Sequence, residues 1–265
     1  MKDLGIFSWF GYELSLPKRL ELITSAGFES TCLWFGVEEE LVATNEADRM
    51  PELARGLGLK IDNVHAPYIG CNSLWTERDK DAVLTTYDAA ISFCHRHRIP
   101  VTVIHVTEGS SPPPMGKAGL ERIRELARRA GEKDVVLAIE NCDRPDYVDF
   151  LLSECDVQSL GLCYDSSHDF LKGNRSVEIL KKWGHRLITT HFSDNHGEND
   201  DHLLPEDGTI DWEAVTVSFP AETYTGPVML EVLPAPGNRM EAESFLREAH
   251  GRAKRLAERL GQPSL

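Results

Sequence analysis

The stretch VVLAIENCDRPDYVDFLLSECDVQSLGLCYD, residues 135–165, decides the fold, because it holds two short apolar runs with a helical pattern between them. The runs VVLAIEN (135–141) and SLGLCYD (159–165) are apolar at nearly every position, as expected of parallel strands covered on both faces. Between them, DYVDFLLSEC has its apolar residues at helical spacing. A strand, a helix and a second strand form a βαβ unit, which predicts an α/β protein.

The same alternation of apolar runs and helical patterns continues along the whole chain. We identify eight strand candidates in total. They are LGIFSW (4–9), STCLWF (30–35), LKIDNVHAP (59–67), VTVIHV (101–106), VVLAIEN (135–141), SLGLCYD (159–165), LITTHFSD (187–194) and PVMLEVL (227–233). Several of the intervening helix candidates stop at a glycine, which is a common helix end. These glycines are Gly27, Gly131, Gly184 and Gly261.

Eight strand–helix units in about 250 residues match the size of a (β/α)8 TIM barrel. No linker, low-complexity segment or change of composition indicates a second domain, so we predict that residues 1–265 form a single barrel domain. An open, doubly wound sheet is the alternative architecture. Such a sheet usually carries a glycine-rich first turn, and this chain has none.

The composition limits which kind of protein this chain can be and which kind of partner it can bind. The net charge is −15, from 28 Lys and Arg against 43 Asp and Glu. This charge repels phosphate backbones, so it favours a small molecule or a metal ion over nucleic acid as the partner. The alternative is that the charge only keeps the protein soluble. The six cysteines form no C-x-x-C pair, and no apolar stretch reaches the length of a membrane span. We therefore expect buried, reduced thiols and a soluble cytoplasmic protein.

Six consecutive strand candidates end in a histidine or an acid, at the point where the apolar run stops. These residues are His65, His105, Glu140, Asp165, His191 and Glu231. In a barrel the active site lies at the carboxyl ends of the strands, so these side chains would meet at one mouth. A single residue of this kind is most simply a hydrogen-bonded structural group. Several buried carboxylates together need a cation, and these ligand types suit Mn, Mg, Co, Fe or Zn.

The segment after the seventh strand candidate is unusually polar. HFSDNHGENDDHLLPEDGTIDW, residues 191–212, contains three histidines and seven acids with almost no apolar periodicity. It includes an Asp-x-His pair, Asp200 and His202, and an Asp-x-x-His pair, Asp165 and His168, precedes it. We expect this segment to cross the mouth of the barrel and to supply further ligands or partners of the ligands. A solvated acidic loop is the alternative.

The motifs HAPY, IEN, YDSSHD, HFSDN, DDHLLPEDGTIDW and LEV resemble the xylose isomerase-like TIM-barrel superfamily. That superfamily includes sugar isomerases and epimerases, inosose dehydratases and zinc-dependent apurinic endonucleases. The resemblance to the epimerases implies one divalent ion, which Glu140, Asp165, His191 and Glu231 would hold.

The same resemblance implies a sugar or sugar phosphate isomerase or epimerase with a small polyhydroxy ketone as its substrate. Glu140 and Glu231 would move the proton, because two carboxylates on opposite sides of a metal-bound hydroxy-ketone can pass it through a metal-stabilised enediolate. His168 would hold a substrate hydroxyl or oxyanion. An apolar wall for the sugar would come from Trp9, Trp34 and Phe35, and core packing is the alternative role of these three residues.

Two alternatives stay open. The apurinic endonucleases bind three zinc ions, and the resemblance to them adds a further set of candidate ligands. These are His65, His105, His168, Asp200 and His202. A phosphodiesterase of that kind would use a metal-activated hydroxide, but the acidic segment at the mouth argues against a DNA substrate. The second alternative is a non-catalytic barrel that binds a sugar or a metal, and two opposed glutamates argue against it.

Overall fold

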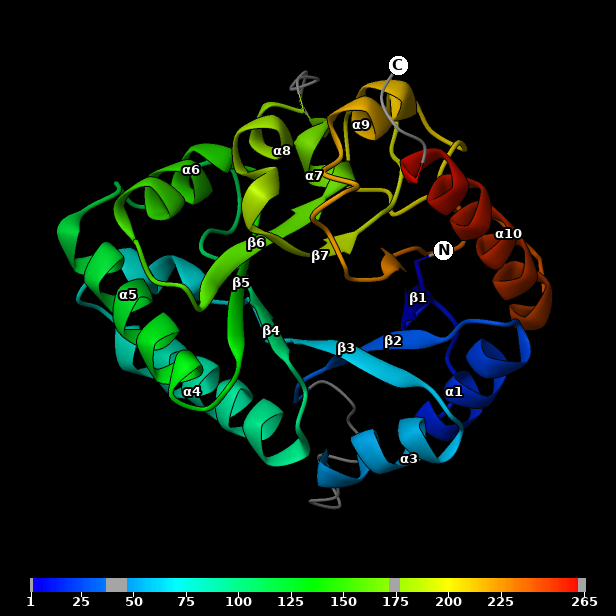
Figure 1. Cartoon of the computed structure of the whole chain (residues 1–265), viewed down its shortest axis with the longest axis horizontal. Helices are drawn as coiled ribbons and strands as arrows, with labels where there is room; N and C mark the ends of the chain where they lie inside the picture. Colours follow the sequence, from blue (N-terminus) through cyan, green and yellow to red (C-terminus); the bar gives the residue numbers. More distant parts are fainter. Residues whose placement is uncertain (1, 37–46, 172–176, 262–265) are drawn as a thin grey trace.

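The computed structural model describes residues 2–36, 47–171 and 177–261. Its strands form a parallel eight-stranded sheet in the order β7-β6-β5-β4-β3-β2-β1-β8, which curls into a nearly closed barrel with the helices around it (Figure 1). The strands are β1 (Leu4–Phe7), β2 (Ser30–Trp34), β3 (Lys60–His65), β4 (Val101–Ile104), β5 (Val136–Glu140), β6 (Leu160–Asp165), β7 (Leu187–His191) and β8 (Val228–Leu230). The predicted (β/α)8 TIM barrel is confirmed.

The helical elements lie between the strands, in the order expected from the sequence (Figure 1). The longer helices are α1 (Leu16–Ser25), α4 (Lys80–His97), α5 (Lys117–Gly131), α6 (Pro145–Glu154) and α10 (Ala242–Leu260). The shorter elements are η1 (Ala47–Arg49), α3 (Met50–Gly56), η2 (Cys71–Trp75), α7 (Ser166–Asp169), α8 (Glu178–Trp183), η4 (Gly184–Arg186) and α9 (Trp212–Ser218). In the described residues, no helix is both long and apolar enough to cross a membrane.

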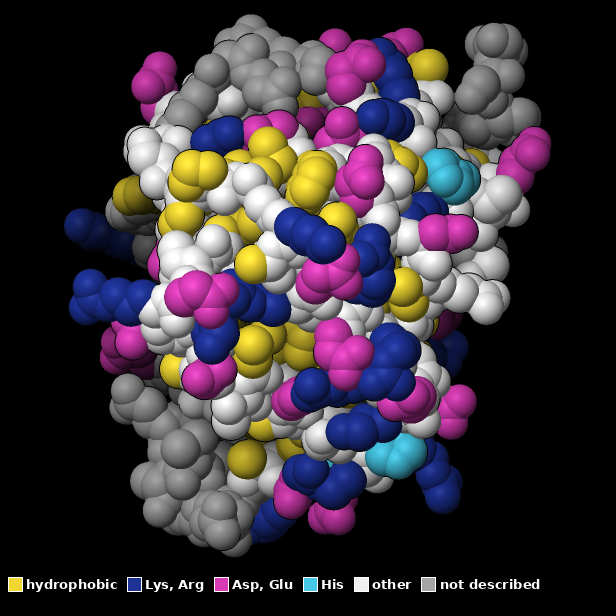
Figure 2. Space-filling model, turned by 90° about the vertical axis from the view of Figure 1, so that its left-hand side faces the viewer, with side chains coloured by type: hydrophobic (Ala, Val, Ile, Leu, Met, Phe, Trp, Pro, Cys, Tyr) yellow, Lys and Arg dark blue, Asp and Glu magenta, His cyan; other side chains and the backbone are white. Residues whose placement is uncertain are grey.

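The helices pack because one stripe of each is apolar. On α10 the buried side chains include Phe245, Leu246, Ala249, Ala253 and Leu256, a spacing that puts them on one face of the helix. The opposite face carries charged residues. Figure 2 shows the side of the barrel at the left of Figure 1, where Lys and Arg side chains are interspersed with Asp and Glu. All six cysteines are buried and unpaired, as predicted.

The barrel closes between β7 and β8 through very few hydrogen bonds. In the described residues one isolated bridge joins the two edges, between Phe192, the residue after β7, and Leu230 of β8. Phe192 N donates to Met229 O at 2.8 Å, and Glu231 N donates to Phe192 O at 3.1 Å. We call this contact the β7–β8 seam. It lies directly beside His191 and Glu231, two of the predicted metal ligands.

Candidate metal site

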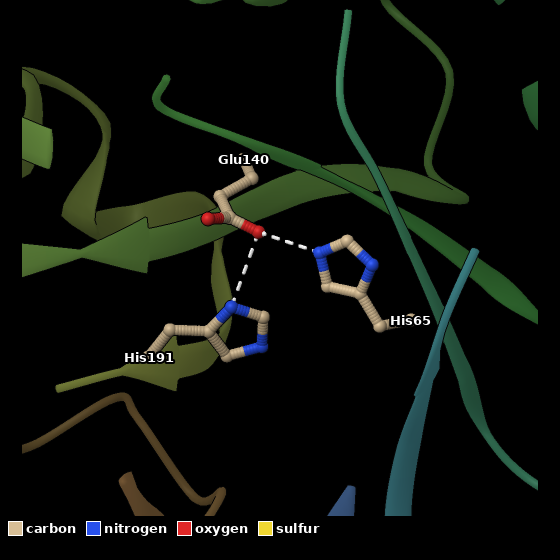
Figure 3. Close-up of side chains that lie close together, drawn as sticks. All are labelled: His65, Glu140 and His191. Atoms are coloured by element: carbon tan, nitrogen blue, oxygen red, sulfur yellow. Dashed lines mark hydrogen bonds and ion pairs between the residues drawn. The ribbon is translucent and has the colours of Figure 1, made fainter. Parts of the chain in front are cut away.

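Glu140, the last residue of β5, lies at the centre of a cluster of histidines. Its Oε2 is 3.2 Å from His65 Nε2, 3.3 Å from His105 Nε2 and 3.1 Å from His191 Nδ1. Its Oε1 is 3.2 Å from His168 Nδ1. Figure 3 shows the rings of His65 and His191 pointing toward the same carboxylate oxygen. Side chains from four other strand ends or the turns after them therefore meet at this carboxylate.

The charge of Glu140 is stabilised by these rings. Burial raises the pKa of Glu140, but its interactions with His105 and His191 and the surrounding hydrogen bonds outweigh burial and hold the pKa well below its usual value. In return, the pKa of His191 is well above its usual value: burial lowers it, and the neighbouring thiol of Cys163, Glu140 and Glu231 raise it by more. The site thus holds a buried carboxylate anion beside imidazolium groups.

Four of the predicted ligands form a set that fits a single cation. Glu140, Asp165, His191 and Glu231 each offer a ligand atom, and these atoms all lie within 4.8 Å of one another. His191 Nδ1 is 3.1 Å from Oε2 of Glu231 as well as from Glu140. Oδ2 of Asp165 is buried and accepts no hydrogen bond from the described residues. A buried carboxylate oxygen without a partner is costly, and a bound cation would compensate for it.

Asp165 is oriented by its neighbours. The side chain of Asn141 accepts a hydrogen bond from Asp165 N and donates one to Asp165 O, both at 2.8 Å. Oδ1 of Asp165 accepts a hydrogen bond from His168 N at 2.8 Å and so caps the short helix α7. Burial, aided by the negative charge of Glu140, raises the pKa of Asp165 to about 7. This carboxyl is therefore protonated in part near neutral pH when no cation is bound.

A chain of hydrogen bonds joins the site to the polar segment after β7. Oδ2 of Asp200 is 3.0 Å from Nε2 of both His168 and His202, and Ser167 Oγ donates to Oδ1 of Asp200 at 2.6 Å. Burial lowers the pKa of His202, but Asp200 and Glu231 raise it by more, to about 10. The expectation that this segment crosses the mouth of the barrel is consistent with these contacts.

The cluster forms the floor of a cavity of about 240 Å³. Trp34, Glu140, His168 and Glu231 are among the residues that line it. A larger cavity, of about 390 Å³, lies next to it between η2 and α4, and no histidine lines it. The smaller cavity therefore holds the histidines and the buried carboxylates, and it is the candidate active site.

The predicted aromatic residues separate into two groups. Trp34 lines the cavity, whereas Trp9 and Phe35 are not among its lining residues. The ring of Phe35 packs against Phe93, with 5.3 Å between the ring centroids. The Arg19 guanidinium lies over the ring of Trp9, 5.0 Å from its centroid. Phe35 and Trp9 thus have packing contacts in this structure.

Sequence reasoning missed one aromatic residue at the site. Tyr68 lines the cavity, and its ring stacks on His105 with 4.8 Å between centroids and 20° between planes. Tyr68 is the last residue of the motif HAPY, so this motif could have identified it as a site residue. Its stacking on a ring from another strand depends on the barrel geometry, which the sequence alone does not display.

Comparison with known proteins gives one family match over most of the chain. The family model described as "Xylose isomerase-like TIM barrel" matches residues 20–249. An uncharacterised protein of Sinorhizobium fredii, y4fM, is 35% identical over 133 residues, which are 48% of this chain and 42% of that protein. An inosose dehydratase of Clostridium botulinum is 27% identical over 135 residues, 43% of this chain and 44% of the relative. The chain thus spans less than half the length of these relatives.

Among solved structures, the chain is similar to a D-psicose 3-epimerase of Clostridium cellulolyticum, which was crystallised with D-tagatose. The TM-score is 0.77, and the match covers 99% of this chain and all of the epimerase. Sequence identity is 15%, so this similarity shows the shared fold alone.

Proposed function

The chain belongs to the xylose isomerase-like TIM barrel family, and from this premise we propose that it is a metal-dependent isomerase or epimerase of a sugar or sugar phosphate. One observation carries the proposal. Two carboxylates, Glu140 and Glu231, lie 3.1 Å from the same nitrogen of His191 at the floor of the cavity. Two acid/base groups beside one ligand position suit the removal of a proton from carbon and its return.

Glu140, Asp165, His191 and Glu231 would hold the ion. Their carboxylate and imidazole ligands suit Mn, Co, Mg or Zn, and the unpartnered Oδ2 of Asp165 supports a bound cation. When bound, the ion would stabilise the negative charge that develops on the substrate oxygens during proton abstraction.

The protonation states of the side chains support these roles. Burial raises the pKa of Glu231, but the charge of His191 and its hydrogen bond outweigh burial and lower it. Glu140 and Glu231 are therefore both anions at neutral pH, and either can accept the proton from carbon. His168 lines the same cavity with a pKa well above its usual value: burial lowers it, and Asp165 and Asp200 raise it by more. Its two N–H groups face Glu140 and Asp200, so His168 would donate to a substrate hydroxyl or oxyanion by exchanging one of these contacts.

The test is proton exchange on carbon. The metal-loaded protein is incubated in D₂O with a panel of ketoses and ketose phosphates, and deuterium at the carbon next to the carbonyl is measured by mass spectrometry. Glu231→Gln should lower the rate of exchange by about 10²–10⁴-fold, the usual contribution of a positioned acid or base. The matched control is Glu198→Gln, an exposed carboxylate in the segment after β7. Unchanged exchange in Glu231→Gln would show that Glu231 moves no proton.

A second candidate function is a metal-cluster phosphodiesterase. Two groups of contacts favour it. His65 and His105 approach Glu140, and His168 and His202 approach Asp200. The four histidines and Asp200 would extend the four-ligand set to a larger metal cluster. Elemental mass spectrometry of protein purified without chelators separates the two proposals. About one ion per chain supports the isomerase, and two or three zinc ions support the phosphodiesterase.

A non-catalytic barrel that binds a sugar or a metal is the remaining alternative. It predicts that a ketose binds while no deuterium enters it. Calorimetric titration with the same panel of ketoses therefore accompanies the exchange assay.

A further inference from the structure

Asp194 is a fully buried carboxylate outside the cluster of metal ligands. Its Oδ1 accepts hydrogen bonds from Asn195 N at 2.9 Å and from Ile210 N at 3.1 Å. Its Oδ2 accepts from Glu206 N at 2.9 Å and from Trp212 Nε1 at 2.7 Å. Four N–H donors therefore converge on one carboxylate, two on each of its oxygens. Its negative charge is stabilised by oriented N–H groups.

The donors come from both ends of one segment, residues 194–212, which we call the mouth segment. Asp194 and Leu203 also exchange two backbone hydrogen bonds, both at 2.8 Å. Leu233 N donates to His202 O at 2.7 Å. Because residues before and after Asp200 and His202 are tied to Asp194 or to the end of β8, these two side chains have little freedom to leave the site.

Gly208 supplies independent evidence of this close approach. A Cβ atom added at Gly208 would lie 2.3 Å from Asn195 O and 2.3 Å from Oδ1 of Asp194. No real side chain tolerates such distances to a backbone carbonyl. The segment therefore passes Asp194 at a distance that only glycine allows.

We propose that Asp194 is a positioning residue that folds the mouth segment so that Asp200 and His202 lie beside the candidate metal site. Asp194 does not line the cavity, and it acts through the position of Asp200, which bonds His168 and His202. The use of Asp200 and His202 in metal binding rests on the proposed function. The fold of the segment around Asp194 does not.

The first experiment measures the segment itself, in metal-free protein, by hydrogen–deuterium exchange with mass spectrometry. In Asp194→Asn the amide NH₂ must face two of the four N–H donors in either orientation. We expect exchange in residues 195–210 to accelerate about tenfold or more, because a hydrogen bond to a charged acceptor contributes at least that factor to an opening equilibrium. Trp212→Phe removes a single donor and keeps most of the packing, so it should accelerate exchange in the same peptides to a smaller extent.

The matched control is Asp211→Asn. Asp211 lies in the same segment and accepts hydrogen bonds from Glu213 N and Ala214 N at 3.1 and 3.0 Å. It is exposed and caps only α9, so its substitution should leave exchange in residues 195–210 unchanged. Equal exchange in wild type, Asp194→Asn and Trp212→Phe overturns the positioning role.

The second experiment connects the segment to the site by a double-mutant cycle read as Mn²⁺ affinity in calorimetric titrations. Asp194→Asn should weaken Mn²⁺ binding about 10–100-fold in the wild-type background, the usual effect of losing a partner of a metal ligand. In the Asp200→Ala background it should have little further effect, because it acts through Asp200. Equal losses in both backgrounds overturn the proposal, since they indicate a general structural defect. If wild type binds no Mn²⁺ or Zn²⁺, the proposed function fails, and the exchange data alone decide the positioning role.

Discussion

Glu140→Gln should destabilise the metal-free protein, and by an amount that depends on pH. The substitution keeps the shape of the side chain and removes the one negative charge that four histidine nitrogens approach within 3.3 Å. Glu140 is 1% exposed, so water cannot replace the lost charge. Removal of one partner from a buried ion pair costs about 3–5 kcal/mol. At about 2–4 °C per kcal/mol for a chain of this size, the expected fall in Tm is about 6–20 °C.

The sign of the pH dependence follows from the pKa shifts. Glu140 has a lowered pKa, so its stabilisation is present above the unfolded value of 4.5 and is lost as the pH falls through the folded value. His168 and His191 have raised pKa values, so their stabilisation is present below the unfolded value of 6.5 and is lost as the pH rises through the folded values. Both contributions are full between pH 4.5 and 6.5. The deficit of Glu140→Gln should therefore be largest near pH 6 and smaller at high pH.

The assay is thermal unfolding of chelator-treated protein at pH 6 and pH 9, with the histidine titrations followed by NMR. The control is Glu108→Gln, which alters a carboxylate of the same cavity whose hydrogen bond comes from Gly70 N at 3.1 Å. It should cost well under about 1 kcal/mol, the net value of one ordinary hydrogen bond, because the side-chain carbonyl of glutamine can still accept from Gly70 N. If Glu140→Gln unfolds with the Tm of wild type at pH 6, or if its deficit is the same at both pH values, the charge assignment at this site is wrong.

Two further predictions concern protons and packing. Metal binding near neutral pH should release protons, because burial raises the pKa of Asp165 to about 7 and the ion displaces that proton. Calorimetry in two buffers of different ionisation enthalpy measures the proton release. Equal binding heats in both buffers would contradict the prediction. Gly161→Ala should lower Tm, since the new Cβ would lie 2.2 Å from Ile188 Cγ1 and overpacking costs about 1–3 kcal/mol. The control is Gly56→Ala, whose new Cβ meets open space and should leave Tm unchanged. Equal Tm values for the two variants would refute the clash.

The barrel and the strand-end residues could be predicted from the sequence because both follow from short-range patterns. A buried parallel strand is an apolar run, and its first polar residue marks the point where the chain reaches the mouth. The convergence of His65, Glu140 and His191 then follows from the topology, since the carboxyl ends of parallel strands meet at one edge. Most strands end one to three residues earlier than predicted, whereas β6 ends at Asp165 as predicted; β7 stops at His191, and Asp194 further along pairs with Leu203.

Contacts made by irregular segments could not be predicted in this way. Trp34 and Phe35 are neighbours in the sequence, yet Trp34 lines the cavity and Phe35 packs on Phe93. Which of two adjacent aromatic residues faces the mouth depends on where the strand ends, and periodicity places such ends only to within a few residues. The four hydrogen bonds to Asp194 were equally hidden, because their donors come from positions with no repeating pattern.

The β7–β8 seam links the shape of the barrel to the state of its site. β7 and β8 are the two edge strands of the sheet, and in the described residues one bridge joins them. His191 stands on one side of this seam and Glu231 on the other, with 3.1 Å between their nearest ligand atoms. A cation held by both would add a second link between the two edges, beside the backbone hydrogen bonds of the seam. Binding at the floor of the cavity would then also reinforce the closure of the barrel where its hydrogen bonds are fewest.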